Sequence, residues 1–131
     1  MELQPVRPTV RTPASNFTGD VYLTPITTTE TLNAGLVRFT PGARTNWHRH
    51  PAGQTLHVTE GVGLVGTRDG QVLRIRAGDT VACPPGEDHW HGAAADTFMS
   101  HFALTGIGPE GEPAVWLEPV GQDQYDKAAL R

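Results

Sequence analysis

Fifteen glycines and eleven prolines, spread between short apolar runs, limit most strongly how this 131-residue chain can fold. Both residue types weaken helix interiors, so a helical bundle does not accommodate that many of them. Asp69-Gly70 between two apolar runs is a strong hairpin signal, because both turn positions need a positive φ. The pattern predicts an all-β chain whose short strands close into a barrel or a double-sheet roll.

The expected strands follow one another from residue 20 onward, and their ranges are 20–24, 32–40, 45–50, 54–59, 63–67, 72–76, 80–84, 89–92, 97–104 and 114–118. A short helix is expected over residues 122–130. Residues 1–16 are rich in proline and weakly patterned, which predicts an extended N-terminal arm. Residues 17–131 are expected to form a single domain.

Composition restricts the classes of partner and the compartment. Charged residues make up 18% of the chain and the formal net charge is −4, so no basic surface is available for a nucleic acid. The single cysteine, Cys83, excludes an internal disulfide framework and suits a reducing compartment. The sequence shows neither the apolar core of a signal peptide nor a membrane-spanning run. We therefore expect a cytoplasmic protein without a nucleic-acid or membrane partner.

Two His-x-His pairs are the strongest functional signal. Alternate residues of a strand share a face, so His48 lies beside His50 and His89 beside His91. Gln54 follows a turn that brings the next strand back beside the first pair. One such pair alone is more typical of histidines that only form hydrogen bonds. Two pairs with a nearby amide favour a metal site, and the oxygen donor favours the harder ions.

The remaining candidates point to structural roles. Strand alternation places His57 on the outer surface and Cys83 in the core. His101 lies on the less apolar face of its strand, which leaves a structural role and a role in a cavity equally open. Glu87 and Asp88 are expected to be solvated loop charges. The three tryptophans are interpreted as packing or interface residues: Trp47, Trp90 and Trp116.

These residues resemble the two motifs of the cupin superfamily. The first motif reads Gly42, His48-x-His50, Gln54 and Gly61, and the second reads Gly78, Pro84-x-Gly86, His89 and Ala93. Every spacing is met, but glutamine replaces the usual glutamate and alanine the usual asparagine. The resemblance implies a double-stranded β-helix, a jelly-roll barrel with one metal ion near its centre, in a homodimer or homotetramer.

Residues 41–56 and 85–94 further resemble bacterial cupin-type hydroxynitrile lyases. In that family glutamine is the expected fourth ligand, which implies a metal held by His48, His50, Gln54 and His89. The usual ion is manganese, with iron, nickel or zinc as alternatives. The resemblance also places histidines at the positions of His91 and His101 beside the substrate.

The same analogy implies that small residues line the substrate pocket. Gly35 and Val37 would leave room for an aromatic ring. Thr45 is a further pocket candidate, although strict alternation puts it on the face opposite to His48.

A small-molecule lyase is therefore the leading functional hypothesis. An amide ligand leaves a divalent ion without a negative protein ligand, which strengthens it as a Lewis acid. Such a site suits cleavage of a cyanohydrin such as mandelonitrile, with His91 and His101 as acid and base. The alternatives are a cupin dioxygenase or isomerase acting on a small oxygenated ring or sugar, and a non-catalytic ligand-binding cupin.

Overall fold

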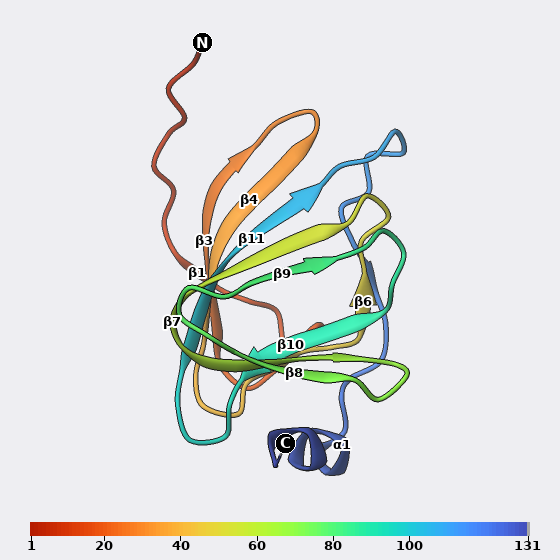
Figure 1. Ribbon diagram of the computed structural model, residues 1–131. Helices are drawn as coiled ribbons and strands as arrows, with labels where there is room; N and C mark the ends of the chain where they lie inside the picture. Colours follow the sequence, from red (N-terminus) through yellow and green to blue (C-terminus); the bar gives the residue numbers. More distant parts are fainter. Residues whose placement is uncertain (131) are drawn as a thin grey trace.

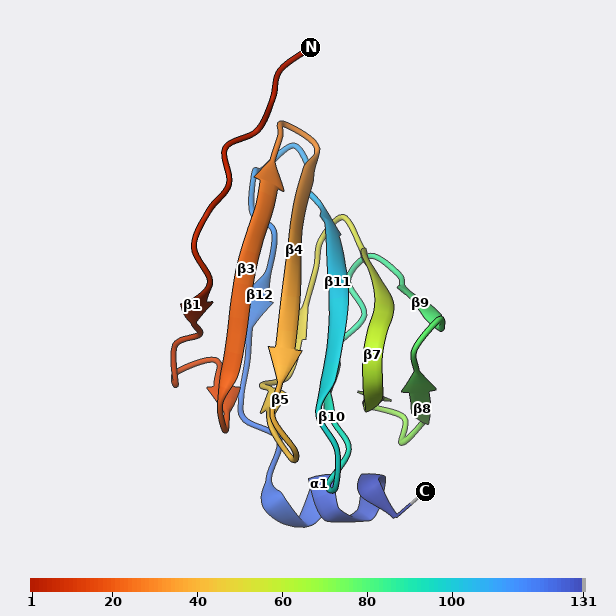
Figure 2. The same cartoon turned by 90° about the vertical axis from the view of Figure 1, so that its left-hand side faces the viewer.

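Two curled sheets that share one long strand form most of the molecule. The computed structural model describes residues 1–130, and Figures 1 and 2 show the sheets rolled around a common interior. One sheet contains β1 (Val10–Arg11), β3 (Val21–Thr28), β4 (Leu32–Phe39), β11 (Met99–Gly106), the first half of β7 (Gln54–Thr67) and β9 (Thr80–Cys83). The other contains β2 (Phe17–Thr18), β5 (Arg44–Thr45), β6 (His48–Arg49), β8 (Val72–Arg76), β10 (His89–Ala93), β12 (Val115–Trp116) and the second half of β7. The predicted all-β barrel is confirmed.

The strand β7 crosses from one sheet to the other without a break. The prediction of two separate strands, 54–59 and 63–67, is therefore wrong. Gly61 makes the continuous path possible, because its φ is +77° and a Cβ there would lie 1.9 Å from the carbonyl oxygen of Phe98. The register against β11 shifts between Ser100 and His101, as expected for a bulge that bends a strand.

Alternation along the strands separates the core from the surface. In β4, Val37 and Phe39 are buried while Arg38 between them is exposed. The interior cluster also includes Leu56 and Val58 of β7. The side chain of Cys83 is buried and that of His57 is exposed, as the alternation predicted.

The N-terminal segment runs past the edge strand β3 and extends beyond the sheets, and the C-terminal helix lies at their opposite end (Figure 2). Residues 1–9 have no regular structure, and β1 then pairs with the edge strand β3. The predicted C-terminal helix is confirmed as α1 (Gln122–Ala129). Tyr125 of this helix is buried and packs with Trp90. The Tyr125 hydroxyl donates a hydrogen bond to the carbonyl oxygen of Ala93 over 2.7 Å. Within residues 1–130, no helix is long and apolar enough to cross a membrane.

Candidate metal centre

Three buried histidines from neighbouring segments converge at one point inside the rolled sheets. His48 lies on β6, His50 follows it, and His89 begins β10, directly opposite His48 in the strand register. One ring nitrogen from each of the three lies within 4.8 Å of the others, so the group could hold a metal ion. The His-x-His spacing predicted that His48 and His50 share a side, and their ring centroids are 4.9 Å apart.

Backbone carbonyl groups orient all three imidazoles in the same way. Each ring places its Nδ1 beside a main-chain oxygen: His48 beside Asn46 at 2.9 Å, His50 beside Pro113 at 2.6 Å and His89 beside Glu87 at 3.1 Å. Because a carbonyl oxygen only accepts, each neutral ring carries its proton on Nδ1 and leaves the Nε2 lone pair bare. Hydrogen bonds of this type fix the tautomer and orientation of histidine ligands in metal sites.

Burial keeps these imidazoles in the neutral form that binds metals. It lowers the pKa of His89 to about 4 and is the main cause of a lowered pKa at His48 and His50. For His48 the neighbouring His89 lowers the pKa further. The rings therefore require no deprotonation before they bind a cation near neutral pH.

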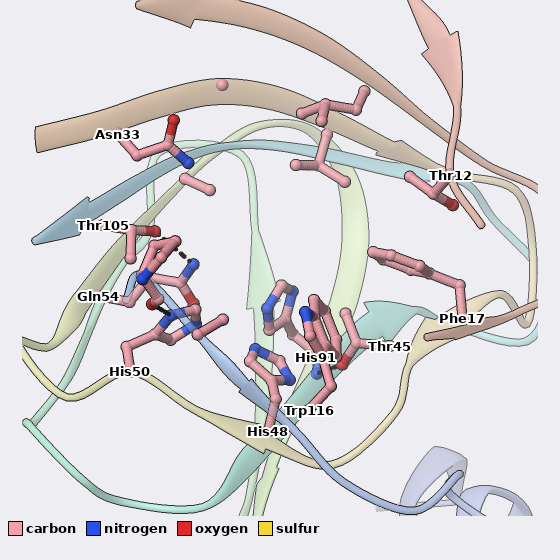
Figure 3. Close-up of a pocket in the computed structure, with 16 residues that line it drawn as sticks. Thr12, Phe17, Asn33, Thr45, His48, His50, Gln54, His91, Thr105 and Trp116 are labelled. Carbon is pink, nitrogen blue, oxygen red and sulfur yellow. Dashed lines mark hydrogen bonds between the residues drawn. The ribbon is translucent and has the colours of Figure 1, made fainter. Parts of the chain in front are cut away.

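Gln54 presents its amide oxygen to the same point. Its Nε2 donates to Oγ1 of Thr105 over 3.0 Å (Figure 3). Its Oε1 lies 3.2 Å from Nε2 of His89. The side chain is buried. Because Thr105 holds the nitrogen of the amide, the oxygen is free to act as a fourth donor.

These donors fit a divalent metal ion. The Nε2 atom of His50 is buried and has no hydrogen-bond partner within residues 1–130. Burying a polar atom without a partner costs free energy unless another group, such as a metal ion, binds it. The donor set of three imidazoles and one amide oxygen suits several divalent ions of the first transition row. None of the four side chains carries a negative charge, so a bound dication would keep its full charge.

A cavity of about 230 Å3 opens beside this centre. Its walls include the side chains of His48, His50, Gln54 and His91 (Figure 3). Gly35, Val37 and Thr45, the predicted pocket residues, also line it. None of the lining residues is Asp, Glu, Lys or Arg. The cavity is therefore uncharged apart from any ion at the centre.

Thr45 reaches the cavity because strand alternation is interrupted after it. β5 ends at Thr45 and β6 begins only at His48, so the two residues are not parts of one regular strand. The side-chain oxygen of Thr45 accepts from the backbone N–H of His91 over 3.1 Å. The expectation of opposite faces, based on strict alternation, is wrong for this pair.

Two aromatic residues that the sequence did not assign to the pocket also line it. Phe17 and Trp116 both line the cavity, with ring centroids 5.4 Å apart. The ring of Trp116 also lies 4.6 Å from that of His48, at an interplanar angle of 33°. The interpretation of Trp116 as only a packing or interface residue is therefore incomplete. No local pattern marks either residue, because each lies on a strand of two residues far away in the chain.

His91 and His101 form a second pair beside the three histidines. The Nε2 of His101 lies 2.9 Å from Nδ1 of His91, and both rings are buried. His91 lines the cavity, whereas His101 does not and lies behind it. Burial is the main cause of a low pKa at both, to about 4 for His101, and each lowered pKa keeps the ring neutral. The Nε2 of His91 has no partner within residues 1–130.

Asp88 is paired and not simply solvated. Its carboxylate accepts from Arg49 over 2.9 Å and from Arg68 over 3.2 Å. Arg68 also donates to both carboxylate oxygens of Glu118, and its guanidinium lies 4.0 Å from the ring centroid of Trp47. These ion pairs connect Glu118, in the segment before α1, with Arg49 of β6 and with Asp88, which directly precedes β10.

The fold and the histidine centre are those of a cupin, and the chain belongs to the cupin family: residues 35–104 match the family described as "Cupin domain". Over 116 residues the chain is 47% identical to an (R)-mandelonitrile lyase from Granulicella tundricola, covering 86% of this chain and 88% of that protein. The sequence-based identification as a cupin similar to hydroxynitrile lyases is thereby confirmed.

Solved structures agree with this assignment. A cupin-like protein from Thermotoga maritima superimposes with a TM-score of 0.85 at 37% identity, covering 90% of this chain and 91% of that one. The polyketide cyclase RemF from Streptomyces resistomycificus superimposes with a TM-score of 0.64 at 16% identity, covering 81% and 76%. The second likeness concerns the fold alone.

Proposed function

We propose that this protein is a metal-dependent lyase that cleaves cyanohydrins of the mandelonitrile type into an aldehyde and hydrogen cyanide, and forms them in reverse. The observation that carries the proposal is that His91 lines an uncharged cavity beside the histidine centre, while its buried Nε2 has no hydrogen-bond partner within residues 1–130. The 47% identity to a mandelonitrile lyase supports the choice of substrate.

His48, His50, His89 and Gln54 would hold the metal, for which manganese is our first choice. When bound, the ion supplies a positive charge that polarises the substrate hydroxyl and stabilises the charge developing on its oxygen. The four neutral donors serve this purpose because they do not offset that charge.

We assign the proton transfer to His91. Its Nε2 would take the hydroxyl proton of the substrate while the bond between the carbinol carbon and the nitrile carbon breaks. The electron pair of that bond leaves with cyanide, and the carbon–oxygen bond becomes a carbonyl. The same proton then returns from His91 to cyanide, so the histidine ends the reaction unchanged.

His101 would act through His91 and not on the substrate. When Nδ1 of His91 carries the proton, it donates to Nε2 of His101 across the 2.9 Å contact. This tautomer leaves the Nε2 lone pair of His91 facing the cavity as a base. His101 is therefore a positioning residue that also stabilises the imidazolium formed when His91 takes the proton.

The cavity walls suit an aromatic substrate. Gly35 and Val37 contribute only small side chains to the lining, and Phe17 and Trp116 add two aromatic rings 5.4 Å apart. The test is a cleavage assay with racemic mandelonitrile on the manganese-loaded protein, following benzaldehyde by absorbance. We expect enantioselective release of benzaldehyde above the buffer rate. A rate equal to that of the apoprotein would contradict the proposal.

A further inference from the structure

A row of polar side chains runs across three adjacent strands at the cavity wall. Asn33 of β4 pairs with Thr105 of β11, and Thr105 pairs in turn with Gln54 of β7. Residues directly opposite each other on antiparallel strands have Cβ atoms roughly 5 Å apart. All three side chains line the same cavity (Figure 3). The row therefore leads from the rim of the cavity to the metal centre.

Hydrogen bonds within the row leave two donors without acceptors. Oδ1 of Asn33 accepts from the hydroxyl of Thr28 over 2.9 Å, and Figure 3 shows its amide nitrogen turned toward the cavity. Oγ1 of Thr105 accepts from Gln54, so its own hydrogen is available. Within residues 1–130, neither the Asn33 amide N–H groups nor the Thr105 hydroxyl hydrogen has an acceptor. Thr105 is only 4% exposed, so a ligand is the natural partner for its hydrogen.

Thr105 lies close to the point where a substrate oxygen would be held, and Asn33 lies one strand further toward the rim of the cavity. Thr105 is one hydrogen bond away from the Gln54 amide, whose oxygen lies 3.2 Å from Nε2 of His89. A ligand with one oxygen at the centre can therefore bring a second acceptor, bonded to the same carbon atom, against Thr105 and Asn33. The uncharged walls and an uncompensated dication further favour an acceptor that carries negative charge.

We propose that Asn33 and Thr105 form a subsite with two hydrogen-bond donors. This subsite would bind a second acceptor group of the ligand, attached to the same carbon atom as the oxygen held at the metal centre. This proposal rests on the proposed function for the orientation of the ligand. In a cyanohydrin the group is the nitrile, and in a 2-hydroxy acid it is the carboxylate. The subsite selects alcohols that carry such a group over simple alcohols of the same size.

The test compares the affinity of two stable probes, mandelate and benzyl alcohol, for the manganese-loaded full-length protein by titration calorimetry. Both probes share a phenyl ring and a hydroxyl group, but only mandelate carries the second acceptor. We expect the protein to prefer mandelate. Thr105→Val should lower this preference about 10-fold or more, the usual effect of losing one hydrogen bond to a charged group.

Asn33→Asp provides a second, independent variant. It keeps the oxygen that accepts from Thr28 but replaces the donor by a negatively charged oxygen, so mandelate should bind still more weakly. Thr105→Val also removes the acceptor of the Gln54 amide N–H, so the effect on the subsite is the change in the ratio of the mandelate affinity to the benzyl alcohol affinity. Thr55→Val is the matched control, because Thr55 is one residue from Gln54 in β7, on the opposite face of the strand.

The outcomes separate this proposal from the cleavage activity. A mandelate preference that survives unchanged in Thr105→Val and Asn33→Asp overturns the subsite, as does a wild-type protein that shows no preference. A preference lost in both variants supports the subsite even if the protein fails to cleave mandelonitrile. Melting temperatures of the variants, measured in the same buffer, show whether they are folded at the temperature of the titration.

Discussion

The Nε2 atom of His101 lies 2.9 Å from Nδ1 of His91, and only His91 of the two lines the cavity. This relationship distinguishes two residues that the family resemblance places together beside the substrate. In the proposed reaction, His91 would therefore contact the substrate and His101 would control the tautomer of His91.

Replacing either histidine should reduce turnover while metal content stays the same. His91→Ala removes the base and should lower kcat by about 10²–10⁴-fold. His101→Ala should have a smaller effect on kcat, because Nε2 of His91 still faces the cavity. Steady-state kinetics, with metal analysis of each preparation, check both expectations. Unchanged kcat in both variants would exclude the pair from the mechanism.

His101→Gln distinguishes positioning from simple packing. A glutamine at this position can still accept a hydrogen bond from Nδ1 of His91, whereas alanine cannot. We expect the glutamine variant to recover part of the lost kcat with little change in KM. Equal kcat in the two variants would show that the hydrogen bond has no role.

Gly61 should be the least replaceable glycine of the sheet. Its positive φ alone disfavours any other residue, and an added Cβ would also collide with the carbonyl oxygen of Phe98 at 1.9 Å. Gly61→Ala should therefore lower the free energy of unfolding by more than about 2 kcal/mol. Gly78 is the matched control, because its φ is +95° but no atom lies within 4 Å of the added Cβ.

Urea denaturation of the two alanine variants compares these effects. Gly78→Ala should cost about 1 kcal/mol, the cost of the backbone conformation alone. Equal stability of the two variants would mean that the bend in β7 tolerates a side chain, contrary to the close approach of β7 and Phe98.

The ion pair between Arg68 and Glu118 should make stability depend on pH. The hydrogen bonds from Arg68 lower the pKa of Glu118 from its ordinary value of 4.5 to about 2. A carboxylate with a lowered pKa in the folded state stabilises the protein above its ordinary pKa. That contribution is lost as the pH falls from 4.5 toward 2.

Glu118→Gln removes this contribution at every pH. The melting temperature of the wild-type protein should exceed that of the variant at neutral pH, by a small amount because the pair is exposed. The difference should shrink as the pH falls below 4.5. If the difference in melting temperature stayed constant down to pH 2, it would come from packing and not from the charge of Glu118.

Local patterns in the sequence predicted the strands and the histidines that come together, because both follow from the two-residue period of a strand. His48 and His50 share a side for this reason, and Gln54 follows at the return of the chain. Long-range features could not be predicted in the same way. The place of Trp116 depends on a two-residue strand that pairs with β6 across the chain.

Other features depend on strand register, which a single sequence does not reveal. The alignment of Asn33 with Thr105 requires knowing how β4 lies against β11. The continuous path of β7 depends on Gly61, which in the sequence resembles an ordinary turn glycine. Thr45 reaches the cavity only because the regular strand stops after it.

Metal binding to the apoprotein tests the central claim most directly. Titration calorimetry with manganese chloride should show one ion bound per chain of the wild-type protein. His48→Ala, His50→Ala and His89→Ala should each abolish this binding, and His57→Ala, which changes an exposed histidine on β7, should not. Manganese binding that persists in all three variants, or is absent from the wild-type protein, would contradict the assignment of the centre.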